Sequence, residues 1–206
     1  MIDHPVRHLV VGITGASGSI YGLKLVKALL QVETRVSLLI TEAGRQVLNH
    51  ETGLDWDAET QKRRRQVQEY FSSIAVECLD IDDIGAVIAS GSSAPDGMIV
   101  APCSMGTAAR IAAGLSGNLL ERAADVMLKE GRPLIIVPRE TPLSSIHLEN
   151  LLRLSRAGAT ILPAMPGFYH RPKDLEQVTN FVVGKILDQM KLPHELFEPW
   201  GQEETT

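Results

Sequence analysis

This chain of 206 residues contains few aromatic residues, few cysteines and no excess of positive charge. Aromatic residues make up only 4% of a chain that is 44% hydrophobic, so Ala, Val, Ile and Leu must build most of its core. The formal net charge of −5 argues against a nucleic-acid-binding protein, which usually carries a strongly basic surface. The one basic run, residues 62–65, is interpreted as a solvated helix face beside nearby acidic residues.

Metal motifs and long apolar runs are also missing from the sequence. Cys78 and Cys103 are too few for a disulfide framework and lack CxxC spacing. The six histidines are scattered and none has HExxH spacing, so we predict no catalytic metal. No apolar run approaches the roughly 18 to 20 residues of a membrane span, and residues 1–5 lack a signal-peptide pattern. These absences predict a soluble protein of the reducing cytoplasm, with no membrane or nucleic-acid partner.

Apolar segments of strand length alternate with segments of helical periodicity along the whole chain. Strands are predicted at residues 8–14, 35–41, 75–79, 97–101, 133–137 and 160–162. Helices are predicted at residues 19–30, 42–50, 54–73, 118–130, 146–157 and 174–190, with another ending near residue 113. Continuously apolar strands joined by helices predict a parallel sheet covered on both faces. We therefore expect a single Rossmann-like, doubly wound α/β domain over residues 1–206, with a C-terminal tail at 191–206.

Several helix ends carry recognisable capping residues. Asn118 with Glu121 has the pattern of a capping box, and Asp174 with Gln177 is predicted to begin the last helix. Gly158 suits the left-handed position that follows a helix. These residues fix the expected ends of three helices.

Ligands of doubly wound sheets bind outside the carboxyl ends of the strands, which makes the loops at 15–19, 41–44, 102–107 and 138–145 candidate sites. The first loop, GASGS, has small residues followed by a helix whose free N–H groups suit a phosphate. It matches neither the GxGxxG motif of NAD sites nor the P-loop of ATPases. Phosphate or flavin binding is therefore favoured, and a tight turn without a ligand is the alternative.

The loop at 102–107, PCSMGT, repeats this arrangement after another strand. The hydroxyls of Ser104 and Thr107 lie at a helix start, where they are available to a ligand, although Ser104 is also interpretable as an ordinary N-cap. No neighbouring histidine marks Cys103 as a thiolate nucleophile, so we interpret it as a buried small residue.

Charged residues on one helix and in one loop are further candidates. Arg122 and Lys129 are two helical turns apart and share a face, which on spacing alone favours a solvated stripe. Arg139 and Glu140 directly follow a buried strand. Arg139 could bind phosphate and Glu140 could relay a proton, or the two could form an ion pair that only steadies the loop.

Two further polar side chains lie towards the C-terminus. The hydroxyl of Tyr169, in the loop FYHRP, could donate to an anion. Lys185 interrupts an apolar run of the last helix, and its aliphatic stem could simply snorkel to solvent.

Taken in order, the strings GASG with YG, ASGS, APCS, ERAADV, LKE, VPRETP, HLEN and GFYHRP resemble the UbiX flavin prenyltransferase family over residues 8–200. The combination of PRETP with FYHRP is highly specific. The resemblance implies FMN and dimethylallyl monophosphate as substrates. It also implies prenylated FMN as the product, which is the cofactor of a UbiD-type decarboxylase partner.

The resemblance also assigns roles to single residues. It implies FMN contacts for Gly15, Ala16, Ser17, Thr41, Ser104, Met105, Gly106, Thr107 and Arg139. It implies substrate contacts for Tyr169, Lys185, Lys129, Arg139 and Trp200. Catalytic positions are implied for Ser17, Glu51, Arg122, Lys129 and Glu140. Thr41 replaces the serine of many relatives, and Lys185 replaces the arginine of some, which keeps the charge but loses the bidentate fork and bears on phosphate affinity.

The implied chemistry needs cations where the allylic carbon–oxygen bond breaks and a phosphate leaves. Lys129, Arg139 and Lys185 would supply this charge without a metal, while Ser17 would act near the flavin N5 atom and Glu140 or the departing phosphate would move a proton. The aspartates at 80–83 lack the second copy that Mg²⁺-dependent prenyl transfer uses, and they are interpreted as a turn cluster.

Two alternatives share this fold class. A flavin-dependent decarboxylase would need a catalytic histidine and a substrate clamp that the sequence does not display. A flavin carrier would not need the cations at 129, 139 and 185. The family resemblance also implies a homododecamer with sites at subunit borders, and ubiquinone synthesis is one pathway that the product would serve.

Overall fold

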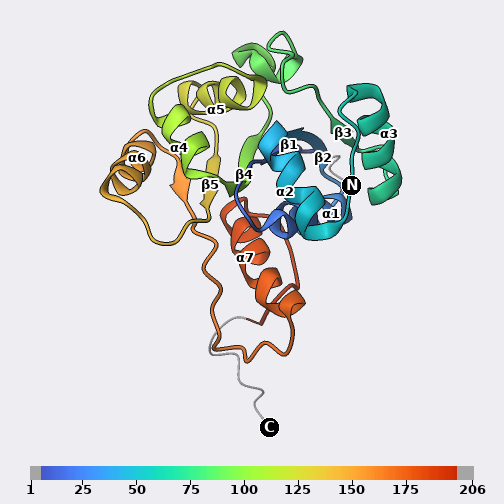
Figure 1. The fold of residues 1–206 in the computed structure, drawn as a ribbon, viewed down its shortest axis with the longest axis vertical. Helices are drawn as coiled ribbons and strands as arrows, with labels where there is room; N and C mark the ends of the chain where they lie inside the picture. The colour runs from blue at the N-terminus through green and yellow to red at the C-terminus, as the bar shows by residue number, and fades with distance from the viewer. Residues whose placement is uncertain (1–5, 199–206) are drawn as a thin grey trace, which may run out of the picture.

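The computed structural model describes residues 6–198, which form a six-stranded parallel sheet with helices on both faces (Figure 1). The strands are β1 (His8–Ile13), β2 (Arg35–Ile40), β3 (Val76–Cys78), β4 (Gly97–Cys103), β5 (Leu134–Pro138) and β6 (Thr160–Ile161). Their order across the sheet is β3-β2-β1-β4-β5-β6. The chain winds outward from β1 in one direction and returns to β4 on its other side, which confirms the predicted doubly wound fold.

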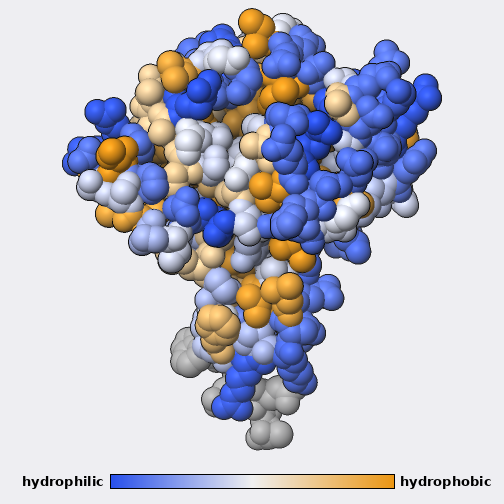
Figure 2. Space-filling view, viewed as in Figure 1, coloured by the Kyte–Doolittle hydropathy of each residue, from blue (hydrophilic) through white to orange (hydrophobic). Residues whose placement is uncertain are grey.

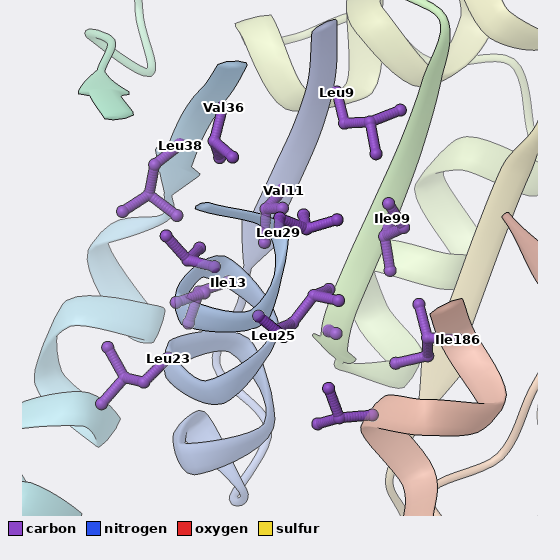
Figure 3. Packing of buried hydrophobic residues seen from close by; sticks show 14 of the residues in the cluster. Leu9, Val11, Ile13, Leu23, Leu25, Leu29, Val36, Leu38, Ile99 and Ile186 are labelled. Carbon is purple, nitrogen blue, oxygen red and sulfur yellow. The ribbon is translucent and has the colours of Figure 1, made fainter. Parts of the chain in front are cut away.

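Seven α-helices of the described residues cover the sheet. They are α1 (Ser19–Gln31), α2 (Glu42–Thr52), α3 (Thr60–Phe71), α4 (Met105–Ala112), α5 (Leu119–Lys129), α6 (Ser145–Arg156) and α7 (Leu175–Gln189). Alternate residues of β1 enter two separate cores. Val11 and Ile13 pack with Leu25 of α1 and Ile186 of α7 (Figure 3), whereas Val10 packs with α4, α5 and α6. The strands are apolar throughout because both faces of the sheet are covered.

The polar segment at 54–73 is helical only in its second part, where α3 lies. The interpretation of residues 62–65 as a solvated face is wrong for Arg63, which is 6% exposed. Its Nη1 donates to the backbone carbonyls of Asp57 (3.0 Å) and Ala58 (2.7 Å). These backbone carbonyls lie outside any strand, and the buried arginine supplies the hydrogen-bond donors that they need.

The predicted helix ends are largely confirmed. Asn118 Oδ1 accepts from Glu121 N (2.9 Å), Asp174 Oδ1 accepts from Gln177 N (2.8 Å), and Gly158 has φ 104°. The carboxylate of Glu121 accepts from the N–H of Gly117 (2.9 Å), one residue before the N-cap that a capping box would use. Within residues 6–198, no helix is long and apolar enough to cross a membrane.

Candidate active site

The loops that follow β1 and β4 leave the sheet side by side, at the point where the strand order reverses. Buried Thr14 ties them together. Its N–H (3.2 Å) and its hydroxyl (2.9 Å) both donate to the Pro102 carbonyl, and its Oγ1 accepts from Ser104 N (2.7 Å). Thr14 is absent from the sequence-predicted site residues, although a threonine that closes an apolar strand just before a glycine-rich loop was the available signal.

The N-terminus of α4 is open towards the loops. Ser104 is its N-cap and accepts from Thr107 N (3.3 Å), and the two hydroxyls are 3.0 Å apart. The predicted N-cap role of Ser104 is therefore confirmed. A Cβ built on Gly106 would meet no atom within 4 Å, so free space lies over the first turn. A helix N-terminus with space before it suits an anion.

The N-terminus of α1 is occupied by the protein itself. Glu51, near the end of α2, accepts from Gly18 N (2.8 Å) and Ser19 N (2.8 Å), and also from the Ser19 hydroxyl. Burial alone would raise the pKa of Glu51, but hydrogen bonds from the Ser17 and Ser19 hydroxyls and from these two N–H groups outweigh burial and lower that pKa. The expectation of free N–H groups after GASG is thus wrong for Gly18 and Ser19, because a carboxylate from another helix already binds them.

The rest of the first loop is closely packed. Ala16 is 5% exposed, and a Cβ added to Gly15 would lie 2.7 Å from the Cβ of Ala43 at the start of α2. Met105, the first residue of α4, is also 5% exposed. The small residues therefore let β1, α2 and α4 approach one another, and the loop leaves its backbone rather than long side chains at the sheet edge.

Arg139, in the loop after β5, joins this group. Its Nε donates to the Ser17 carbonyl (2.9 Å), and its backbone N–H donates to the Cys103 carbonyl (3.3 Å). Glu140 is exposed, and its Oε1 accepts from Thr141 N (3.1 Å). Arg139 thus contacts the first loop, which favours a role at the site over an Arg139–Glu140 pair that only steadies the loop.

Thr41 lies at the start of α2, where its Oγ1 accepts from Gly44 N (3.0 Å). It lines a polar cavity of about 540 Å³, together with Arg45, Arg63 and Asp80. Thr41 is therefore placed at the same carboxyl edge of the sheet as the first loop, on the side of β2.

Arg122 and Lys129 both belong to α5, away from the three loops described above. Arg122 Nε donates to the Ala89 carbonyl (3.2 Å), and Lys129 Nζ pairs with Glu130 (3.0 Å). Both side chains therefore border the 3-10 turns at Val87–Ala89 and Gly91–Ser93, beside α5. Their shared helix face is confirmed. The two helices pack in different cores, α5 with Val10 of β1 and α7 with Val11 and Ile13, so Arg122 and Lys129 are carried on a different layer from the residues of α7.

Tyr169 and Lys185 form a third group. They line a cavity of about 830 Å³ with Asp188, residues 192–195, Phe197 and Glu198. The Tyr169 ring packs edge-on against Phe181 of α7 (5.7 Å). Lys185 Nζ is 3.0 Å from Asp188 Oδ2. Lys185 therefore does more than extend its ammonium group into solvent, because that group pairs with a carboxylate.

The two cysteines and Trp200 complete the predicted residues. Cys78 and Cys103 are both buried, and burial raises the pKa of the Cys103 thiol to about 12, so it is no thiolate nucleophile. Within residues 6–198, no group of three or more His, Cys, Asp or Glu side chains is arranged to hold a metal ion. Trp200 lies outside the described residues.

Comparisons with known proteins agree on a family. The Flavoprotein family model matches residues 3–187. The flavin prenyltransferase UbiX of Alkalihalophilus pseudofirmus is 54% identical over 204 residues, which cover 98% of this chain and all of the relative.

Solved structures give the same picture. AnUbiX in complex with FMN and dimethylallyl pyrophosphate is 39% identical, with a TM-score of 0.84 over 97% of this chain and all of the other. A dodecameric FMN-dependent UbiX-like decarboxylase from Escherichia coli is 41% identical, with a TM-score of 0.83 over 94% of this chain and 99% of the other.

Proposed function

This chain belongs to the UbiX-type flavin prenyltransferases of the flavoprotein family, and from that premise we propose that it transfers a dimethylallyl group from dimethylallyl monophosphate to reduced FMN. In this reaction the N5–H and C6–H bonds of the flavin are replaced by bonds to the five-carbon unit. The allylic carbon–oxygen bond breaks and phosphate leaves, and a proton adds to the carbon–carbon double bond that the closure at C6 consumes. Prenylated FMN is the product. The observation that carries the proposal is the meeting of three loops, which bear Ser17, Ser104 and Arg139, at the reversal point of the sheet.

The residues at this edge fit FMN. Free space over Gly106 leaves the first turn of α4 open to the flavin phosphate, which the Ser104 and Thr107 hydroxyls would bind. Gly15, Ala16, Thr41 and Met105 form the surrounding wall. When bound, reduced FMN supplies the nucleophilic nitrogen and carbon, and the chain holds and orients it.

Ser17 and Glu51 act as a pair in this proposal. The Ser17 hydroxyl donates a hydrogen bond to the Glu51 carboxylate, and this contact helps to lower the pKa of Glu51. The carboxylate therefore stays charged and holds the hydroxyl beside the flavin. A carboxylate with a lowered pKa is a poor proton acceptor. Proton transfer therefore falls to exposed Glu140 or to the leaving phosphate, and Glu51 positions Ser17.

The leaving phosphate needs cations that one chain does not bring together. Arg139, Lys129 and Lys185 belong to three separate groups, bordering Ser17, the 3-10 turns and Asp188. We propose that a homododecamer unites them, with Arg122 and Lys129 supplied by a neighbouring copy. Apolar side chains on the surface of α6 support this: Ile146 is 66% exposed and Leu152 49% exposed, and apolar patches interrupt the hydrophilic surface there (Figure 2).

Charge favours a monophosphate donor. The cavity that contains Lys185 and Tyr169 also contains the carboxylates of Asp188, Glu195 and Glu198. A diphosphate would bring more negative charge next to these groups. Competition between dimethylallyl monophosphate and diphosphate tests this, and we expect the monophosphate to have the higher kcat/KM.

The product defines the partner. A UbiD-type decarboxylase would bind prenylated FMN as its cofactor. We place both proteins in the cytoplasm, where ubiquinone synthesis is one pathway that would use the cofactor.

Mass spectrometry tests the activity. Purified protein, reduced FMN and dimethylallyl monophosphate are mixed under anaerobic conditions, and the molecular mass of the flavin is then measured. A gain of one C5 unit is expected, and EDTA should leave the rate unchanged. An unchanged flavin points to a carrier or a decarboxylase, and a strict Mg²⁺ requirement contradicts the site as described.

Subunit mixing tests the shared site. Lys129→Ala and Arg139→Ala should each weaken the use of the phosphate substrate. If the two residues of one site come from different copies, unfolding and reassembling an equal mixture should restore about a quarter of the sites by random pairing. No recovery in a fully reassembled mixture means that both residues serve the site from one chain.

A further inference from the structure

The cavity beside α7 has a wall that the predicted site residues do not account for. It is lined by Tyr169 and Lys185 on one side and by the segment 192–198 on the other, and its volume is about 830 Å³. That segment follows α7 and folds back over it. Side chains of this segment, such as Phe197, therefore lie close to Lys185 across the cavity.

Lys185 is held within this cavity by two contacts. Its Nζ is 3.0 Å from Asp188 Oδ2, one helical turn further on, and lies 5.7 Å from the centre of the Phe197 ring. The side chain is 44% exposed, so its ammonium group still faces the open space. A lysine has a flexible stem of four carbons, so holding its ammonium group in one place costs rotamer entropy.

Asp188 is itself held by His194. The second carboxylate oxygen, Oδ1, is 3.0 Å from His194 Nε2, and His194 Nδ1 accepts from Leu196 N (3.3 Å). Because Nδ1 accepts a backbone N–H, the ring proton of the neutral histidine lies on Nε2 and is donated to Asp188. The His194 side chain is 10% exposed, which keeps the ring in place.

Gly184 makes this packing feasible. A Cβ on Gly184 would collide with the Phe197 ring and lie 2.8 Å from His194 Cε1. Glycine inside a helix is less stable than alanine, and here its missing side chain leaves room for His194 and Phe197. The segment is thus seated against the turn of α7 that carries Lys185.

We propose that Asp188 and His194 are positioning residues that hold the Lys185 ammonium group ready for the phosphate of the prenyl donor. The inference rests on the proposed function, in which Lys185 binds that phosphate. A lysine lacks the fork with which an arginine grips phosphate in two places. The chain from His194 through Asp188 to Lys185 compensates by fixing the ammonium group before the substrate arrives.

The test uses His194 variants, because changing Asp188 alone would also remove a negative charge near the phosphate. In the full-length protein, His194→Ala should raise the KM for dimethylallyl monophosphate about tenfold while kcat and FMN affinity stay within about twofold, a size typical of coupled neighbours. His194→Gln keeps an N–H donor and should recover most of the loss. Gly184→Ala, which changes no charge, should reproduce the rise in KM by displacing the segment.

Double variants show whether His194 acts on KM through its contacts with Asp188 and Lys185. Adding His194→Ala to Lys185→Ala, or to Asp188→Ala, should produce little further rise in KM. The proposal is overturned if His194→Ala leaves KM unchanged, or if its effect adds in full to that of Lys185→Ala. Failure of the proposed function is a separate result, because the unaltered protein would then not prenylate FMN at all.

Discussion

The N-termini of α1 and α4 lie next to each other at the reversal point of the sheet, yet they are occupied differently. In α1 the carboxylate of Glu51 binds Gly18 N and Ser19 N. In α4 the N-cap is Ser104, and the space over Gly106 is open. Both helices follow strands and both have a small N-cap residue, Gly18 for α1 and Ser104 for α4, so the sequence presents them as equivalent phosphate sites.

The difference shows which terminus is left for a ligand. An anion from the chain itself neutralises the dipole of α1 and uses its N–H groups, so a second anion there would be repelled. The α4 terminus keeps its partial positive charge facing open space. We therefore expect the flavin phosphate at α4, and the flavin ring nearer to Ser17.

A carboxylate placed at α4 should break this difference most strongly. Gly106→Asp would imitate at α4 what Glu51 does at α1, and FMN affinity should fall about a hundredfold, or roughly 2.7 kcal/mol. Folding should be preserved, because a Cβ there meets no atom within 4 Å and acidic residues suit a first turn. Flavin absorbance titration measures the effect. Gly106→Asn is the uncharged control of the same size, and equal losses in both variants would place the phosphate elsewhere.

Thr14→Val tests what holds the α4 terminus in place. Valine keeps the shape but leaves the Pro102 carbonyl without the hydroxyl donor and Ser104 N without its acceptor. The melting point should fall by the equivalent of about 2 kcal/mol, as for buried groups that lose a partner, and FMN binding should weaken. Thr14→Ser keeps the hydroxyl and should retain most of both properties. Unchanged melting of the valine variant would mean that the two loops are held without this residue.

Glu51→Gln should leave the N-terminus of α1 without a bound carboxylate, as at α4. The change removes the anion from the helix terminus and should cost about 1 kcal/mol of stability at pH 7, the usual size of a capping contact at an exposed site. Because the pKa of Glu51 is lowered in the folded protein, its contribution is complete above the unfolded pKa of about 4.3 and is lost as the pH falls through the folded pKa. Thermal melts of both proteins should therefore converge in acid. A constant gap down to acid pH would show that the charge of Glu51 is not what stabilises α1.

The smallest effect is expected at Cys103, the last residue of β4, which directly precedes the N-cap of α4. Its thiol is buried and its pKa is raised to about 12, so iodoacetamide at neutral pH should leave the native protein unmodified and active. The same reagent should label Cys78 and Cys103 after unfolding, which is the control. Loss of activity on labelling the native protein would indicate a reactive thiol at the site.

The loops of the site were predictable, because strand periodicity and the rule for parallel sheets locate them without any contact information. Ser104 and Arg139 were found in this way. Glu51 was suggested by family resemblance alone, since its partners Gly18 and Ser19 are more than thirty residues earlier in the chain. Arg63 was misinterpreted because a basic run looks solvated unless the carbonyls behind it are known.

The sequence by itself determined the order of strands and helices, the doubly wound sheet and the set of loops at its carboxyl edge. These depend on local periodicity and on general rules of chain connection. Only the tertiary structure decided that Glu51 fills α1, that Lys129 lies apart from Arg139, and that His194 reaches Lys185 through Asp188. Such contacts join residues whose spacing carries no local signal, because side-chain charges pair across space according to how the helices pack.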